Sequence, residues 1–439
     1  MIVAGFGIPQ ALAKPVINLP YDAVTDLERG QELYEVVNNP AYAGYIIQLS
    51  SGVYLLDPAK PNNGRLVLQP GMEIVGENQY VDCDGDGVYD PVNCVTEPLD
   101  HSAQFTTDGT QTLIDGSAIT NQPGAQPGPG LIRLGRDNRL SHITVRGPEA
   151  ASFISANVHI NLDVDGVVSA KVSDILVEGG AAGIRCNNPP LIPYTFAQAK
   201  IERNIVRNAV TWGIVINNPN TDGNAWEVGL NYNRIYNNTA GIFILNNQSA
   251  FAETRVVSRG NVIEFNKAGI MVMAGQDAGG QVGRGGSNNF ISLVSQEDMI
   301  RNNTGRVTIQ GLNNIGGGVV AMAGGNVTPS LSASSGNELV LQFLDTRFED
   351  NNYMANDGQL YLNHASVFGY WTYVSREAGT NNTARAHVRL GKEDETTDGF
   401  WMRNTVSLTP DLSGNEVTVK GSNVTFKVAD PDGLPIPTN

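Results

Sequence analysis

Charged residues are scarce in this sequence. Asp, Glu, Lys and Arg make up 16% of its 439 residues, against about 25% in typical soluble domains. Aromatic residues make up 7% and cysteines number three. No run of about 18 apolar residues occurs, so we expect no transmembrane helix. Disorder is also excluded, because 41% of the residues are hydrophobic and Ile and Val recur in short clusters throughout the chain.

Basic residues are the scarcer of the two charged classes. The chain has 28 Lys and Arg against 44 Asp and Glu, a formal net charge of −16. Such a chain repels phosphate backbones, so nucleic acid is not an expected partner. The H-E-x-x-H, G-x-S-x-G and Walker motifs are absent. The histidines are too scattered along the sequence to predict a metal cluster: His101, His142, His159, His364 and His387.

An internal repeat of 28 to 29 residues dominates the middle of the chain. Three clusters of Ile and Val begin at glycines 28 residues apart: Gly213, Gly241 and Gly269. The turns before them contain asparagines 29 residues apart: Asn208, Asn237 and Asn266. Alternating apolar stretches bounded by Asn and Gly indicate strands and turns. This period fits one coil of a parallel β-helix, in which stacked asparagines would form a ladder.

These repeats resemble the pectate-lyase-like right-handed parallel β-helix superfamily. The segments 46–54 and 66–76 look like the first coils of that family, and the resemblance covers residues 42–375. It implies an all-β fold, a single right-handed parallel β-helix. It also implies an extracellular polysaccharide as the target, and we expect a monomer.

Both ends of the solenoid carry segments typical of caps. Residues 25–38 place Leu27, Leu33, Val36 and Val37 at helical spacing, which predicts an amphipathic N-terminal cap. Residues 417–426 have the pattern of a C-terminal strand or hairpin cap. We therefore divide the chain into a cap at 14–41, the β-helix at 42–405, and a C-terminal cap and tail at 406–439.

The first residues resemble part of a secretory signal peptide. An apolar stretch over 2–13 ends in Ala11-Leu12-Ala13, a small-residue cleavage pattern, although no basic residue precedes Lys14. The alternative is a buried terminal strand. We expect residues 1–13 to be a signal remnant and the protein to be extracellular or periplasmic.

An acidic segment near the N-terminal end predicts a calcium site. It follows the D-x-D-x-D-G-x-x-D pattern of EF-hand loops and resembles a thrombospondin type-3 repeat. Calcium binds six to eight oxygen atoms, and the predicted ligands are Asp82, Asp84, Asp86, the Val88 carbonyl, Asp90 and Asn93. Asn93 stands where the pattern has a bidentate Glu. A disulfide between Cys83 and Cys94 would close this insertion at 80–100, whereas Cys186 is predicted to be a buried thiol.

Four insertions share one phase of the repeat, at 187–196, 217–225, 246–253 and 274–288. They should emerge along one edge of the solenoid. If the first isoleucine of each repeat points inward, the next residues face outward in one column: Arg185, Val215, Phe243 and Met271. This outward column has two possible roles. Either the loops fold over it and bury it, or it forms an apolar floor against which sugar rings pack, with Arg185 at one end to bind a carboxylate.

A second cluster of candidate residues lies at 361–376. It contains His364, Trp371, Tyr373 and Arg376. A polysaccharide lyase needs a base and a group that neutralises the uronate carboxylate, and these residue types supply both. We interpret His364, Tyr373, Arg376 and Arg185 as candidate catalytic residues. The predicted substrate-binding residues are Arg185, Phe243, Met271 and Trp371.

Together with the resemblance, these residues favour a secreted carbohydrate-active β-helix protein that acts on an acidic extracellular polysaccharide, by the β-elimination of a polysaccharide lyase if it is catalytic. Because the sequence contains no complete set of catalytic motifs, the alternative is a non-catalytic surface, adhesive or structural β-helix that binds glycans. A phage tailspike-like protein is a third reading.

Overall fold

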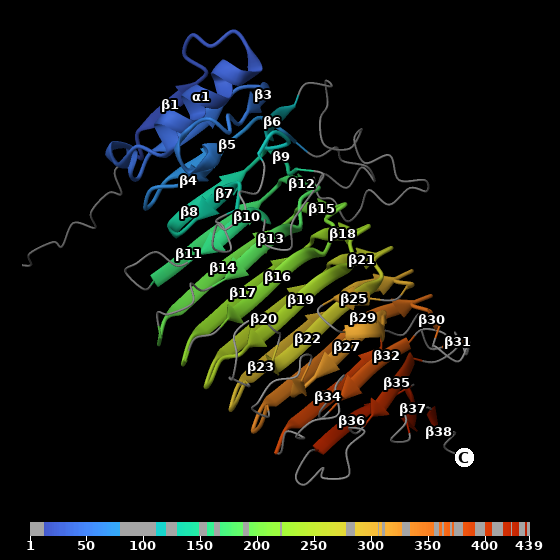
Figure 1. Ribbon diagram of the computed structural model, residues 1–439. Coiled ribbons are helices and arrows are strands. Elements are labelled where there is room, and N and C mark those ends of the chain that lie inside the picture. The colour runs from blue at the N-terminus through green and yellow to red at the C-terminus, as the bar shows by residue number, and fades with distance from the viewer. Residues whose placement is uncertain are drawn as a thin grey trace, which may run out of the picture.

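Strands stack on one another from the N-terminal to the C-terminal end of the molecule (Figure 1). This computed structural model describes residues 13–79, 111–119, 130–148, 156–161, 167–187, 193–219, 222–277, 286–305, 307–309, 312–326, 334–354, 360–361, 364–368, 371–372, 381–390, 400–405, 416–422, 424–429 and 435–436. The predicted calcium loop, the Cys83–Cys94 disulfide and residues 1–12 of the predicted leader lie outside these ranges.

Three parallel sheets form the walls of a right-handed β-helix, and in its regular central part each coil adds one strand to each sheet. Sheet A consists of β1 (Val16–Leu19), β2 (Ile46–Leu49), β5 (Glu73–Val75), β8 (Arg136–Ser141), β11 (Val167–Ser173), β14 (Phe196–Glu202), β17 (Ala225–Asn231), β20 (Glu253–Arg259), β23 (Phe290–Gln296), β29 (Glu338–Glu349), β34 (Thr383–Leu390) and β36 (Glu416–Ser422). The fold class predicted from the repeat is confirmed.

Sheet B follows sheet A along the chain across a short turn. It consists of β3 (Gly52–Leu55), β6 (Thr112–Asp115), β9 (Thr144–Arg146), β12 (Leu176–Glu178), β15 (Ile205–Arg207), β18 (Arg234–Tyr236), β21 (Val262–Glu264), β24 (Met299–Arg301) and the end of β29. The long strand β29 runs through both sheets, because it pairs with β23 and with β24.

Sheet C completes each coil. It consists of β4 (Leu66–Val67), β7 (Ile132–Leu134), β10 (Ala156–Asn161), β13 (Ala182–Asn187), β16 (Trp212–Pro219), β19 (Ala240–Asn247), β22 (Ala268–Asp277), β27 (Gly317–Met322), β32 (His364–Phe368), β35 (Phe400–Thr405) and β37 (Val424–Ala429). The four predicted insertions are the connections from sheet C back to sheet A.

Short elements lie beside these sheets. They are β28 (Gly325–Asn326) with β33 (Trp371–Thr372), the antiparallel pairs β25 (Val307–Ile309) with β26 (Leu312–Ile315) and β30 (Tyr353–Met354) with β31 (Leu360–Tyr361), β38 (Pro435–Ile436) against β37, and the 3₁₀ helices η1 (Pro40–Tyr42) and η2 (Pro61–Gly64).

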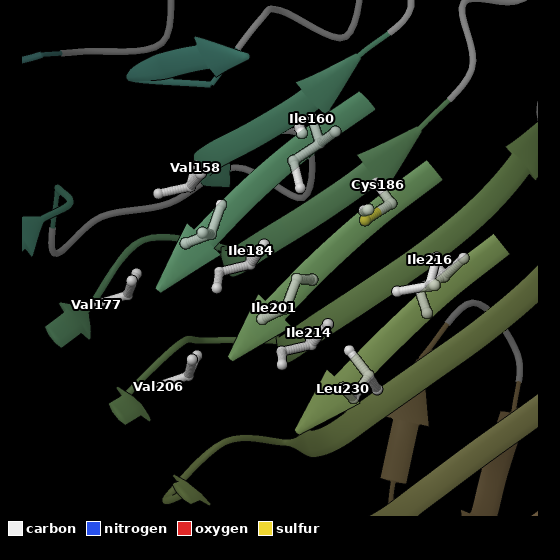
Figure 2. Packing of buried hydrophobic residues seen from close by; sticks show 14 of the residues in the cluster. Val158, Ile160, Val177, Ile184, Cys186, Ile201, Val206, Ile214, Ile216 and Leu230 are labelled. Carbon is white, nitrogen blue, oxygen red and sulfur yellow. The ribbon is translucent and has the colours of Figure 1, made fainter. Parts of the chain in front are cut away.

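The core is a stack of aliphatic side chains that point inward from all three sheets. Figure 2 shows Ile201 and Leu230 from sheet A, Val177 and Val206 from sheet B, and a row from sheet C. In sheet C, Ile184 lies beside Ile214, and the column continues coil by coil. Identical side chains stack because the parallel register repeats, which explains the Ile and Val spacing of the sequence.

Ladders of buried side-chain amides occupy the turns. In the turn between sheets B and C, Nδ2 of Asn238 donates to Oδ1 of Asn266 at 3.1 Å, and Asn266 donates to Asn303 at 3.0 Å. Asparagine ladders are therefore confirmed, but two of the predicted positions are wrong. Asn208 and Asn237 adopt left-handed backbone conformations, with φ of 58° and 55°. The ladder position is the next residue of the turn, which is Asn238 in one coil and Ala209, whose backbone N–H donates to Asn238, in the coil before it.

Opposite charges alternate in one column on the outer face of sheet B. Arg146 lies 2.9 Å from Glu178, and Arg207 lies 2.8 Å from the same carboxylate. Tyr236 follows Arg207 in this column, and Glu264 comes next and bonds Arg301 at 2.8 Å. Glu264 also bonds Arg234 of the neighbouring column at 2.6 Å, and neither Arg234 nor Glu264 has solvent exposure. Alternation joins adjacent coils with ion pairs and avoids like charges on neighbouring strands.

The N-terminal cap is helix α1 (Asp26–Val37), which packs against β3. Thr25 and Glu28 form a capping box that fixes its first turn. Leu33, Val36 and Val37 are buried as predicted, whereas Leu27 is 41% exposed. At the other end, β36 and β37 are strands, as predicted. They extend sheets A and C by parallel pairing with β34 and β35, and do not pair with each other.

One ladder ends in a carboxylate. In the turn between sheets A and B, Asn261 donates to Oδ1 of Asp298 at 2.9 Å, and Ser295 donates to its Oδ2 at 2.6 Å. Burial raises the pKa of Asp298 above its ordinary 3.8. The charged form is thus disfavoured by folding, and stability falls as pH rises through the pKa of the folded state.

We predict that Asp298→Asn stabilises the protein, because an amide keeps the ladder bonds without a buried charge. The melting midpoint at pH 7 should rise by about 2 °C, and the gain should shrink as the pH is lowered toward 4. Thermal unfolding followed by circular dichroism at several pH values measures both effects. Asp22→Asn, which neutralises an exposed carboxylate, is the control. A variant less stable than wild type at pH 7 would contradict the prediction.

Candidate functional site

The outer face of sheet C carries the predicted outward column. Strand register places Arg185 beside Val215, Val215 beside Phe243, and Phe243 beside Met271. The isoleucines that precede them lie in the inner core, so the predicted orientation is confirmed. The column continues through Val320 of β27.

Most of this outer face is a second buried apolar layer. Its members, none more than 6% exposed, are Ala182, Trp212, Val215, Ala240, Phe243, Leu245, Ala268, Met271, Met273, Val320 and Met322. Of the two predicted outcomes, the structure has the buried one. Phe243 and Met271, predicted to contact substrate, are 1% and 0% exposed. They do not form an open floor for sugar rings, because water-sized groups do not reach them.

The N-terminal end of this face is polar, and Arg185 lies there. Nη2 of Arg185 reaches Oδ1 of Asn187 at 3.4 Å. Nε of Arg185 is buried and has no hydrogen-bond partner among the described residues. Loss of hydration lowers the pKa of Arg185 to about 10, so the side chain still carries its charge at neutral pH. No described carboxylate forms an ion pair with it.

Two further polar atoms, both on the neighbouring strand β16, have no partner among the described residues. Oδ1 of Asn217 is buried on β16, in the position next to Asn187, and Asn217 is 6% exposed. Nε1 of Trp212 is also buried, and its ring lies 5.5 Å from that of Phe243. Buried groups without partners are rare in folded proteins. Nε of Arg185, Oδ1 of Asn217 and Nε1 of Trp212 thus lie buried on two adjacent strands of sheet C.

His159 joins this region through the strand register. Its backbone lies opposite Arg185 in the adjacent strand β10, and Arg133 of β7 lies beyond it. Sequence reasoning grouped His159 with the scattered histidines. The signal that would have found it is its spacing, since 26 residues separate it from Arg185, close to one coil of the repeat.

The other predicted catalytic residues do not lie beside Arg185. His364 begins β32, which is five strand steps from β13. At about 4.8 Å per step, the two backbones are roughly 24 Å apart. Trp371 lies on β33, beside β28, while Tyr373 and Arg376 lie outside the described residues. Arg185 and His364 therefore do not belong to one site, because they lie on coils that are five steps apart along the solenoid.

Neither a metal-binding cluster nor a reactive thiol is found among the described residues. Among the described residues, no group of three or more His, Cys, Asp or Glu side chains is arranged to hold a metal ion. Likewise, no helix in the described ranges combines the length and apolar character that a membrane crossing requires. Cys186 is buried, as predicted, and burial raises the pKa of its thiol, which makes it unreactive.

Comparisons with known proteins found similarity only at the level of solved structures. No protein-family model and no curated protein matches the chain. The A-module of mannuronan C-5 epimerase AlgE6 from Azotobacter vinelandii is 13% identical, with a TM-score of 0.35, covering 91% of this chain and 95% of that chain.

Two further solved structures are comparably similar. The catalytic domain of a GH87 alpha-1,3-glucanase in complex with nigerose is 11% identical, with a TM-score of 0.33, covering 96% of this chain and 69% of that one. DFA-IIIase from Arthrobacter chlorophenolicus A6, without its lid, is 10% identical, with a TM-score of 0.34, covering 97% of both chains. At these scores the similarity carries no argument about activity.

Because Arg185 has no ion-pair partner among the described residues, its replacement should change the free energy of unfolding differently from that of a paired arginine. Arg185→Met removes a desolvated charge, so the free energy of unfolding should stay unchanged or rise by about 1 kcal/mol. Arg207→Met is the matched control, because Arg207 bonds Glu178 and Tyr236, and its loss should destabilise by about 1 kcal/mol. Urea unfolding curves compare the two. Equal destabilisation by both variants would mean that Arg185 is a structural residue.

Proposed function

We propose that this protein binds an acidic extracellular polysaccharide and acts on it at the polar end of the outer face of sheet C. The observation that carries the proposal is the environment of Arg185, a charged guanidinium with a buried, unpartnered Nε and no described counter-ion. A planar guanidinium pairs best with a carboxylate. A uronate carboxylate is such a group.

The reaction best served by this arrangement is removal of the proton on the carbon beside the carboxylate. The base takes the proton, and the C–H electron pair moves onto the carboxyl group as an enolate. Arg185 stabilises that developing charge in a water-poor site, where the interaction is strong. The enolate then collapses and forms a carbon–carbon double bond as the bond from the β-carbon to the glycosidic oxygen breaks. That oxygen takes up a proton from the protonated base or from water and leaves as a hydroxyl of the neighbouring sugar. This is β-elimination, the chemistry of a polysaccharide lyase.

His159 is our candidate for the base, because its backbone position adjoins that of Arg185 and imidazole titrates near neutral pH. This assignment replaces His364 as the base at this site. A non-catalytic glycan-binding protein is the second candidate, favoured by one observation: no described side chain that can act as a base contacts Arg185.

Ultraviolet absorbance during incubation with alginate, polygalacturonate and hyaluronate tests the reaction, because elimination creates a conjugated double bond. We expect absorbance to rise with at least one polymer, and Arg185→Met to lower kcat/KM by about 10²-fold. Arg259→Met, which removes an exposed arginine, should leave the rate unchanged. His159→Gln should lose activity without losing affinity for the polymer.

The same assay separates the two candidates. A flat trace from folded protein on every polymer, with binding that depends on Arg185, would support the glycan-binding protein. Absence of both turnover and binding would overturn the proposed function. If the polymer takes up deuterium from heavy water but no double bond forms, the proton-removal step of the proposal stands and the lyase reaction is excluded.

Secretion and a calcium site accompany this proposal. Four aspartates within residues 82–90 repel one another unless a cation binds between them, and the Cys83–Cys94 disulfide we propose forms only in an oxidising compartment. Calcium there would hold the insertion at 80–100 together.

We predict that calcium added to chelator-treated protein gives a saturable binding heat in titration calorimetry. Asp84→Asn combined with Asp86→Asn should abolish that heat, because two of the predicted carboxylate ligands are lost. Asp22→Asn is the control. No heat from wild-type protein up to millimolar calcium would refute the site.

A further inference from the structure

The outer face of sheet A contains a groove of about 850 Å³ that the proposed function does not use. It crosses β8, β11, β14, β17 and β20, on a different wall of the solenoid from Arg185. Its charged lining has five basic and three acidic side chains: Lys14, Arg139, Lys171, Lys200, Arg255, Asp137, Glu202 and Glu227. This excess of positive charge contrasts with the net charge of −16 for the whole chain.

Three of these cations lie directly beside one another. Strand register aligns Arg139 with Lys171, and Lys171 with Lys200. Neighbouring strands are about 4.8 Å apart, so like charges repeat at that interval along the solenoid. Adjacent like charges are unfavourable in a sheet, and sheet B of the same molecule avoids them by alternating Arg with Glu. Sheet A does not avoid them at these three positions.

Internal ion pairs neutralise this row only in part. Lys171 lies 2.8 Å from Glu202. Arg139 is 62% exposed and lies 3.8 Å from Glu73, which already bonds Lys14 at 2.7 Å. Lys200 is exposed, and no described carboxylate forms an ion pair with it. Two cations of the row therefore keep most of their charge available to a ligand.

The row continues into an open, uncharged floor. Gly229 follows Lys200 in the register and Val257 follows Gly229. A Cβ added to Gly229 would meet only Nδ2 of Asn231, at 3.6 Å, so packing within the protein does not require glycine there. Close approach of a ligand to the backbone is one of the reasons for a glycine inside a strand, beside bulges and tight bends. Val257 is 52% exposed and offers an apolar surface to a sugar ring.

We infer that this groove is a second binding site for an acidic polysaccharide chain, which lies along the solenoid axis across the strands of sheet A. The chain's carboxylates meet Arg139 and Lys200, and its sugar rings lie over Gly229 and Val257. The inference rests on the proposed function for the class of ligand. It adds that the protein holds a long polymer on a wall away from the reacting unit, so that short oligosaccharides and polymers bind differently.

Affinity electrophoresis in gels that contain high-molecular-weight alginate or polygalacturonate tests the groove without requiring turnover. Arg139→Gln combined with Lys200→Gln should weaken polymer binding about tenfold at low ionic strength, because each exposed ion pair adds a few-fold, and salt should reduce the difference. Lys267→Gln, an exposed lysine outside the groove, is the control. All substituted residues are exposed, and melting curves verify folding.

Combining these changes with Arg185→Met separates this inference from the proposed function. Retained polymer binding in Arg185→Met that disappears in the triple variant supports the groove, whatever the ultraviolet assay gives. Wild-type affinity in the groove double variant overturns the groove and leaves the proposed function standing. If Lys267→Gln weakens polymer binding equally, the groove is also overturned, because the effect then comes from the net charge of the protein and not from the groove. No binding of any acidic polymer by the wild type overturns both.

Discussion

Parallel register that repeats from coil to coil is the constraint on which the rest of this molecule depends. Each residue lies beside its counterpart one coil earlier, so every position of the repeat becomes a column along the solenoid. Inward columns of Ile and Val form the core. Turn columns of Asn bond their neighbours through buried amides. Loss of register would bury polar columns and expose apolar ones together.

The three outer faces use the same register for different chemistry. Sheet B alternates Arg and Glu, which ties coils together and leaves little charge unpaired. Sheet C buries an apolar layer that ends at Arg185, which has no ion-pair partner among the described residues. Sheet A carries cations on consecutive strands over an open groove. Unpaired charge is costly in a sheet, so its presence on two faces is the basis of the two binding sites we propose.

Sequence patterns predicted the elements best where local rules act alone. The cap helix follows from the Thr25–Glu28 capping box and apolar spacing, and only Leu27 departs, since it faces solvent. The C-terminal strands were expected to pair with each other, yet β36 and β37 join different sheets. Two strands adjacent in sequence look alike in a hairpin and in a solenoid, because both have the same alternation of side chains.

The sequence by itself determined the solenoid, its period and the outward direction of Arg185, because a repeated spacing of glycine and isoleucine leaves one consistent stacking. Only the tertiary structure decided which outward residues are buried, which asparagines stack, and which distant residues share a level. Those outcomes depend on contacts between coils. Arg185 lies beside His159 and far from His364, since the number of coils between two residues, and not their chemical type, sets their separation.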